Sequence, residues 1–224
     1  MDILEAVARR HSVRAYTDKK IEGEVLNELL QEIENCNKDS GLNLQLVTDK
    51  ADVFTGKLAQ KVGFKGANNY IAVVGKKSDD LEEKCGYFGE KIVLKAQMLG
   101  LNTCWTVGTF NRRNAKSNIN LNKGEKLVCV IAIGYGENQG KPHKSTLIDF
   151  LFRCRGDMPS WFMEGMQCAL LAPTAMNKQK FCFKLLDDNK IKAEVTSRFY
   201  SKINLGIAKL HFEIGAGDAQ YEFI

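Results

Sequence analysis

The chain has 224 residues, of which 44% are hydrophobic and 26% are charged, and its formal net charge is +5. A chain of this length and composition can bury a sizeable core without disulfides or metals, which excludes a disordered or disulfide-dependent protein. The mild positive charge suits phosphorylated or other anionic small ligands, but it is too diffuse to indicate nucleic acid.

The seven cysteines are too widely spaced for a C-x-x-C redox or zinc motif. Several stand in apolar strings, as Cys129 does in 127–133, where a thiol behaves as a small hydrophobic group. The first residues lack the apolar core of a signal peptide, and no apolar run is long enough to span a bilayer. We therefore expect a cytoplasmic protein with reduced thiols, no metal site and no membrane or nucleic-acid partner. Secretion with unpaired thiols is the alternative.

The first part of the chain alternates helical and strand patterns. Apolar residues at helical spacing predict helices at 3–9, 23–36 and 80–99, the last ending at Gly100. Alternating or continuous apolar runs predict strands at 42–47, 70–74, 102–107 and 127–134. Between the last two strands, residues 112–126 form a basic stretch without interleaved aromatic residues, which we interpret as a solvated loop.

After Gly140 the composition becomes irregular, and this region contains the predicted internal boundary. Helices are predicted at 161–171 and 205–214, and strands at 181–186, up to 195, and at 221–224. Segment 161–189 resembles segment 22–50, because each has an apolar helix, a polar connector, an alternating strand and an acidic turn. The second part of the chain therefore reads as a weak copy of the first.

The stretch after the first helix carries Arg10, Ser12 and Arg14. In an extended chain, side chains at alternate positions point to the same face. A guanidinium group matches phosphate oxygens, and a serine hydroxyl adds a short polar contact. The stretch therefore predicts a phosphate site, with a solvated basic turn as the alternative.

Three motifs resemble those of the flavin-dependent nitroreductase family. Segment 10–14 is similar to the family's Arg-Arg-Ser-x-Arg pattern, with His11 inserted. Segment 172–179 is similar to Ala-Pro-Ser-Ser-x-Asn-x-Gln, and 100–105 followed by Gly108-Thr109-Phe110 resembles Gly-Leu-Gly-x-x-Trp and a Gly-Phe turn. The resemblance implies an α+β fold with a mixed or antiparallel sheet flanked by helices.

The order of these motifs departs from that of ordinary family members. There the proline-containing loop follows the second helix, and each of two subunits lends it to the flavin mononucleotide (FMN) of the other. Here the slot near Cys36 lacks the motif, which occurs at 172–179 instead. The chain therefore resembles the variety whose two halves form a pseudo-dimer. Residues 1–155 would carry the phosphate site and the central helix, and residues 156–224 would complete the site. One FMN per chain would follow, without a need for homo-oligomers.

The resemblance also implies roles for individual residues. Arg10, His11 and Ser12 would hold the phosphate and ribityl oxygens, and Arg14 would lie beside N1 and tune the reduction potential. His143 and Lys144 stand where the family keeps a late basic pair for the phosphate. The remaining FMN contacts would be Thr106, Val107 and Gly108 near N5, Pro173, Thr174 and Ala175 against the ring, and Asn177 at a ring edge.

The function that follows is an FMN-dependent oxidoreductase. It would pass electrons from NADH or NADPH to a nitroaromatic, a quinone or a similar flat acceptor, with no side chain acting as acid or base. One alternative is a flavin-binding or storage protein without turnover. Another is a basic ligand-binding or nucleic-acid module without a cofactor, which would be colourless.

Overall fold

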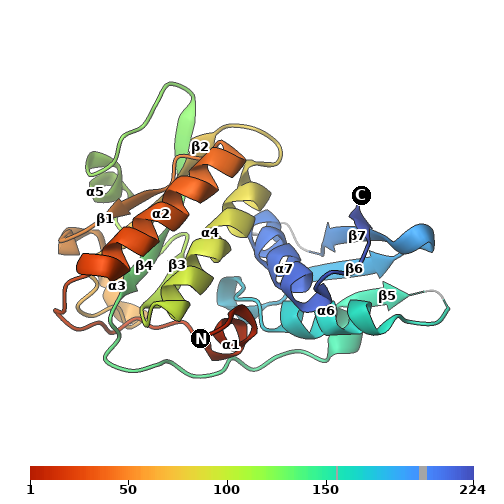
Figure 1. The fold of residues 1–224 in the computed structure, drawn as a ribbon. Coiled ribbons are helices and arrows are strands. Elements are labelled where there is room, and N and C mark those ends of the chain that lie inside the picture. Colours follow the sequence, from red (N-terminus) through yellow and green to blue (C-terminus); the bar gives the residue numbers. More distant parts are fainter. Residues whose placement is uncertain (155, 197–200) are drawn as a thin grey trace. The chain divides into compact units, whose positions relative to one another are not determined.

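The computed structural model describes residues 1–154, 156–196 and 201–224 (Figure 1). They form two compact units that interleave along the chain. Unit 1 comprises Met1–Arg9, Glu82–Glu90 and His143–Ile224, and unit 2 comprises Arg10–Leu81 and Lys91–Pro142. The predicted boundary at residue 155 lies outside the described residues. Within the described ranges, no helix is long and apolar enough to cross a membrane.

Unit 2 is built on a four-stranded antiparallel sheet with the order β1-β2-β4-β3. The strands are β1 (Gln45–Val47), β2 (Tyr70–Lys76), β3 (Asn102–Thr106) and β4 (Glu125–Gly134). The two central strands β2 and β4 are buried almost throughout, as their continuous apolar sequences predict. This sheet fixes the position of the basic stretch, which runs beside β3.

Unit 2 also contains helices and one short 3-10 turn. They are α2 (Gly23–Ser40), α3 (Lys57–Lys61), α5 (Arg112–Ser117), a 3-10 turn η1 (Ala51–Val53), and most of the second half of α4 (Leu81–Met98). In this half of α4, Ile92, Val93 and Ala96 are fully buried. Because its apolar residues recur at helical spacing, this half of α4 belongs to the core.

Two sequence predictions in unit 2 need correction, and two short elements were not predicted. The strand predicted at 42–47 begins only at Gln45. The stretch 112–126, predicted as a loop, begins with α5, whose start is capped by the side chain of Asn111 accepting a hydrogen bond from the N–H of Asn114. The short elements η1 and α3 were not predicted, because segments of three to five residues show no complete period of the apolar pattern.

Unit 1 combines helices with a second sheet. Its helices are α1 (Ile3–Arg9), the first half of α4, α6 (Ser160–Leu170) and α7 (Ser201–Ala216), with 3-10 turns η2 (Ile148–Phe150), η3 (Ala175–Asn177) and η4 (Asp187–Asn189). Its strands are β5 (Phe152–Cys154), β6 (Phe181–Leu185), β7 (Lys190–Val195) and β8 (Glu222–Phe223), in the order β5-β6-β7-β8. The β6–β7 pair is antiparallel and the outer pairs are parallel. The predicted α+β class is confirmed.

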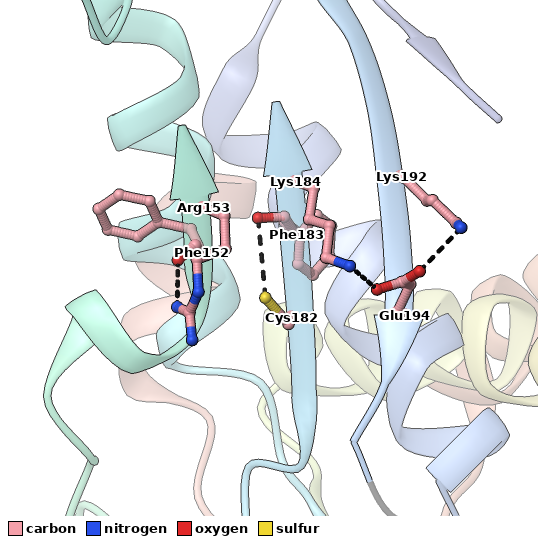
Figure 2. A network of polar contacts seen from close by, with 7 residues as sticks. All are labelled: Phe152, Arg153, Cys182, Phe183, Lys184, Lys192 and Glu194. Carbon is pink, nitrogen blue, oxygen red and sulfur yellow. Dashed lines mark hydrogen bonds and ion pairs between the residues drawn. The ribbon is translucent and has the colours of Figure 1, made fainter. Parts of the chain in front are cut away.

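The two faces of the second sheet differ in chemistry. Phe183 of β6 is buried on one face, where its ring stacks on that of Phe212 in α7 with the centroids 5.1 Å apart. On the other face, Glu194 forms ion pairs with Lys184 and Lys192 (Figure 2). Hydrogen bonds from these two lysines lower the pKa of Glu194. Such surface pairs add little to stability, so we assign the hydrophobic face as the one that holds this sheet in place.

Candidate functional site

The basic stretch of unit 2 is an extended segment held along the edge of β3. Ser12 forms a parallel bridge with Thr103, and the N–H of Val13 donates to the carbonyl of Thr103 at 3.0 Å. On the other side, the N–H of Lys65 donates to the carbonyl of Arg14 at 3.0 Å. Neighbouring strands therefore fix the backbone from which the predicted phosphate ligands project.

The side chains of Arg10, Ser12 and Arg14 all act on one buried thiol, that of Cys104 in β3. Burial raises the pKa of Cys104, while the charge of Arg14, a hydrogen bond with Ser12 and the charge of Arg10 oppose that rise. Arg10 is only 4% exposed, whereas Arg14 is exposed. The structure thus brings the three predicted residues together, and it adds Cys104, which the sequence showed only as a core thiol.

Two contacts support this cluster. The hydroxyl of Tyr16 donates to the carbonyl of Val13 at 2.6 Å, and burial raises the pKa of Tyr16 well above its usual value. Gly140 has a φ of 72°, and a Cβ atom there would lie 2.8 Å from the Cβ atom of His11. Only glycine fits this close approach without a shift of the neighbouring atoms. His11 is half-buried and lies against the segment that follows β4.

The predicted turn Thr106-Val107-Gly108 lies at the end of β3, and a side chain from α5 holds it. Arg112 donates to the carbonyl of Val107 at 3.1 Å and to the carbonyls of Leu127 and Val128 at 2.6 and 3.2 Å. The hydroxyls of Thr106 and Thr109 also share a hydrogen bond. Arg112, which the sequence placed in a solvated loop, therefore braces the backbone of this turn.

The predicted loop of unit 1 has an unusual backbone. Met176, Asn177 and Gln179 have φ values of 52°, 54° and 46°, a left-handed conformation that side-chain-bearing residues seldom adopt. Pro173 is buried, Thr174 and Ala175 are half-buried, and Met176 is 75% exposed. Strained positions of this kind concentrate at functional sites, where surrounding contacts hold them.

Hydrogen bonds from segment 143–146 supply those contacts. Asn177 donates through Nδ2 to the carbonyl of Lys144 at 2.7 Å, and Oε1 of the buried Gln179 accepts from the N–H of Thr146 at 2.7 Å. Gln179 Nε2 donates to the carbonyl of Leu170 at 2.9 Å, and His143 Nε2 lies 3.1 Å from the same oxygen. The predicted residues His143, Lys144 and Asn177 are therefore neighbours within unit 1.

Other residues that support the loop were missed by the sequence analysis. The N–H of Ala175 donates to Oδ1 of Asn204 in α7 at 3.1 Å, and the N–H of Gln179 donates to the hydroxyl of Thr174 at 3.0 Å. Gln179 was visible as the last residue of the loop motif, but Asn204 stood in an ordinary helical pattern. Among the residues that the structure describes, no group of three potential metal ligands occurs.

Comparison with known proteins identifies the fold. A "putative nitroreductase" of Thermotoga maritima is 20% identical, with a TM-score of 0.62, 96% of this chain covered and 83% of that chain covered. An "FMN-dependent Nitroreductase" of Clostridium difficile is 22% identical, with a TM-score of 0.51 and coverages of 63% and 91%. A "Putative NADH dehydrogenase/NAD(P)H nitroreductase" of Parabacteroides distasonis is also 22% identical, with a TM-score of 0.52 and coverages of 66% and 94%. These similarities show a nitroreductase fold.

The sequence itself matches a nitroreductase family along nearly its whole length. No curated protein matches the chain. The family model, however, aligns with residues 2–216, which include the basic stretch of unit 2 and the strained loop of unit 1. Nitroreductases are oxidoreductases, and the chain belongs to the oxidoreductase family described as "Putative TM nitroreductase".

Proposed function

We propose that this protein is an FMN-dependent oxidoreductase. It takes electrons from NADH or NADPH and passes them to a nitroaromatic, a quinone or a similar flat acceptor. Family membership supports the reaction class. The printed names of the structural relatives, one FMN-dependent and another an NAD(P)H nitroreductase, support the choice of cofactor and donor.

The placement of Arg10, Ser12 and Arg14 on one extended segment, held beside Cys104 by the bridge between Ser12 and Thr103, is the observation that carries the proposal. Two guanidinium groups that act on one buried atom create a positive potential that favours an anion. Guanidinium donors bind phosphate oxygens with charge-assisted hydrogen bonds, and the serine hydroxyl can add another. The donors present in unit 2 therefore fit the phosphate of FMN.

Each residue of the basic stretch has a proposed role. Arg10 and Ser12 hold the phosphate and ribityl oxygens, and His11 adds a donor. Arg14 would lie beside N1 of the ring, where a fixed positive charge would raise the reduction potential. Bound FMN supplies the electron transfer, and the protein supplies orientation and electrostatics.

Residues beyond the basic stretch complete the proposed set of FMN ligands. The backbone of Thr106-Val107-Gly108, braced by Arg112, offers an N–H to N5. From unit 1, Pro173, Thr174 and Ala175 would pack against the ring, and Asn177 would hydrogen-bond a ring edge. The Nδ2 of that residue is held by Lys144. His143 and Lys144 are proposed as further phosphate contacts.

We also propose that one chain binds one FMN as a pseudo-dimer. The arginine stretch and the Ala-Pro-Thr-Ala-Met-Asn loop each occur once in the sequence, the first within residues 1–155 and the second within 156–224. One complete set of ligands is therefore available per chain, and a second chain need not contribute any.

The absorption spectrum tests the proposed activity. The protein purified with FMN should be yellow, and NADH or NADPH added without oxygen should bleach it. Reoxidation by a nitroaromatic or a quinone should restore the colour. A protein that binds FMN but keeps its colour with either nicotinamide would instead be a flavin-binding or storage protein, and one that binds no FMN would refute the cofactor assignment.

A further inference from the structure

A pocket of about 280 Å³ opens in unit 2 beside the outer edge of β1. None of its lining residues belongs to the proposed FMN ligands. The lining comprises the segment 17–22, Leu26 and Leu30 of α2, Leu46 of β1, Thr48, Asp49, Asn68 and Asn69. The pocket therefore raises the question of a second ligand with its own chemistry.

β1 borders this pocket as the edge strand of its sheet. Gln45 and Val47 lie opposite Ala72 and Tyr70 of β2, and the N–H of Asn43 donates to the carbonyl of Val74 at 2.9 Å. In an antiparallel pair, every second residue points its N–H and C=O at the partner strand, and the residues between point theirs outward. The backbone groups of Leu44 and Leu46 therefore point away from β2.

The outward N–H and C=O of Leu44 show which chemical group can satisfy the hydrogen bonds of this edge. The side-chain amide of Asn37 in α2 accepts from the N–H of Leu44 at 2.7 Å and donates to its carbonyl at 2.9 Å. A primary carboxamide matches this donor and acceptor pair because its N–H and C=O lie on the same side of one planar group. A strand is thus not needed to satisfy this edge.

The same pair of groups is available at Leu46, which lines the pocket. Its outward N–H and C=O have no hydrogen-bond partner among the described residues, and the side chains of Ile21, Leu26 and Leu30 offer apolar surface nearby. An added peptide strand needs successive outward pairs. Here Asn37 occupies the preceding pair, and the chain beyond β1 turns at Asp49 with a φ of 57°. The edge can therefore accept one amide rather than a strand.

We propose that this pocket binds a small molecule that carries a primary carboxamide on an apolar body. The carboxamide accepts from the N–H of Leu46 and donates to its carbonyl, as Asn37 does at Leu44. The apolar body covers Leu26 and Leu30. This proposal does not depend on the proposed FMN site, because the two sites share no residues.

Benzamide and acetophenone provide a matched pair of probes for this site. Both carry a carbonyl on a phenyl ring, but only benzamide can also donate a hydrogen bond. In amide NMR spectra of the full chain, benzamide should shift the Leu46 amide saturably and bind about tenfold more tightly than acetophenone. Equal affinity for the two probes, or no saturable shift at Leu46, would overturn the proposal.

Two variants locate the contact. Leu46→Pro removes only an outward N–H, which an edge strand tolerates, and Leu46→Ala is the control that keeps it. Because both probes accept from this N–H, both should bind Leu46→Pro about tenfold more weakly than Leu46→Ala, as followed at the amide of Val47. The preference for benzamide depends on the carbonyl of Leu46 and should remain in both variants. Equal affinity of benzamide for the two variants would overturn the contact. Leu30, which is 44% exposed, gives an independent variant, because Leu30→Arg should fill the pocket without disturbing the core and abolish the shift. If Leu46 still responds to benzamide in Leu30→Arg, the pocket assignment is wrong, whether or not Leu46→Pro folds.

Discussion

At the scale of single residues, Arg10 is the most direct test of the proposed phosphate site. Arg10→Ala should weaken FMN binding by about 1.5 to 3 kcal/mol, roughly ten- to a hundredfold, because a charge-assisted hydrogen bond is lost. Fluorescence titration with FMN measures the change. Arg9→Ala is the matched control, since that neighbouring side chain is 64% exposed and pairs with Glu5. Equal affinities of the two variants would count against the phosphate role.

A second residue-scale prediction concerns a buried pair in unit 1. His211 and Glu90 are both 0% exposed, and their Nε2 and Oε1 atoms lie 2.9 Å apart. His211 Nδ1 lies 3.2 Å from the carbonyl of Cys168, which can only accept, so Nδ1 carries a proton. One hydrogen bond in the core therefore joins Nε2 of His211 to the carboxyl group of Glu90.

Substitutions at Glu90 test the hydrogen bond between Glu90 and His211. Glu90→Gln should cost less than about 1 kcal/mol, because a carboxamide of nearly the same shape can keep the hydrogen bond to Nε2 of His211. Glu90→Ala should cost about 3 kcal/mol or more, because it leaves a buried nitrogen without a partner beside a cavity. Urea unfolding measures both. Equal losses would contradict a pair joined by one hydrogen bond.

At the scale of elements, close packing of glycines joins α7 to the first half of α4 in unit 1. A Cβ atom at Gly206 would lie 2.0 Å from the carbonyl oxygen of Glu83 and 2.8 Å from the nitrogen of Tyr87. These are backbone atoms, so they cannot rotate away, and the helices would have to separate.

We therefore expect Gly206→Ala to lower the melting temperature by roughly 2 to 12 °C, the range for overpacking in a chain of this size. Thermal unfolding followed by circular dichroism measures this. Gly56→Ala is the control, because Gly56 has an ordinary φ of −65° and no neighbour within 4 Å of its added Cβ atom. A Gly206→Ala protein as stable as this control would contradict the helix contact.

The long elements could be predicted from the sequence, and the short ones could not. α2, α4 and β4 have enough apolar repeats to show their period, and their starts and ends agree with the predictions within a few residues. β5 has three residues and exists because it pairs with β6, about thirty positions later in the chain, a contact that no local pattern reveals.

The candidate site could likewise be predicted only in part. Motifs in the sequence revealed Arg10, Ser12 and the loop at 172–179, because their residue types are unusual together. The partner of the arginines, Cys104, and the brace of the turn, Arg112, depend on contacts made only in the fold. The left-handed backbone of Met176 and Asn177 was equally hidden, since neither residue type demands it.

At the scale of the whole molecule, two inactive variants can separate a self-contained chain from an exchanging dimer. Arg10→Ala and Asn177→Ala each remove a proposed FMN ligand from a different part of the sequence. If every chain builds its own site, mixing the two proteins should leave FMN binding at the average of the separate samples. Binding restored in the mixture would show that chains exchange parts, and the single-chain architecture would then be wrong.

A binding titration measures how many FMN molecules one chain of this nitroreductase family member holds, and we propose that the number is one. Flavin-free protein is titrated with FMN, and flavin fluorescence is followed at protein concentrations well above the dissociation constant. We expect a sharp end point at one FMN per chain. An end point at one FMN per two chains, or fluorescence that never saturates, would contradict it.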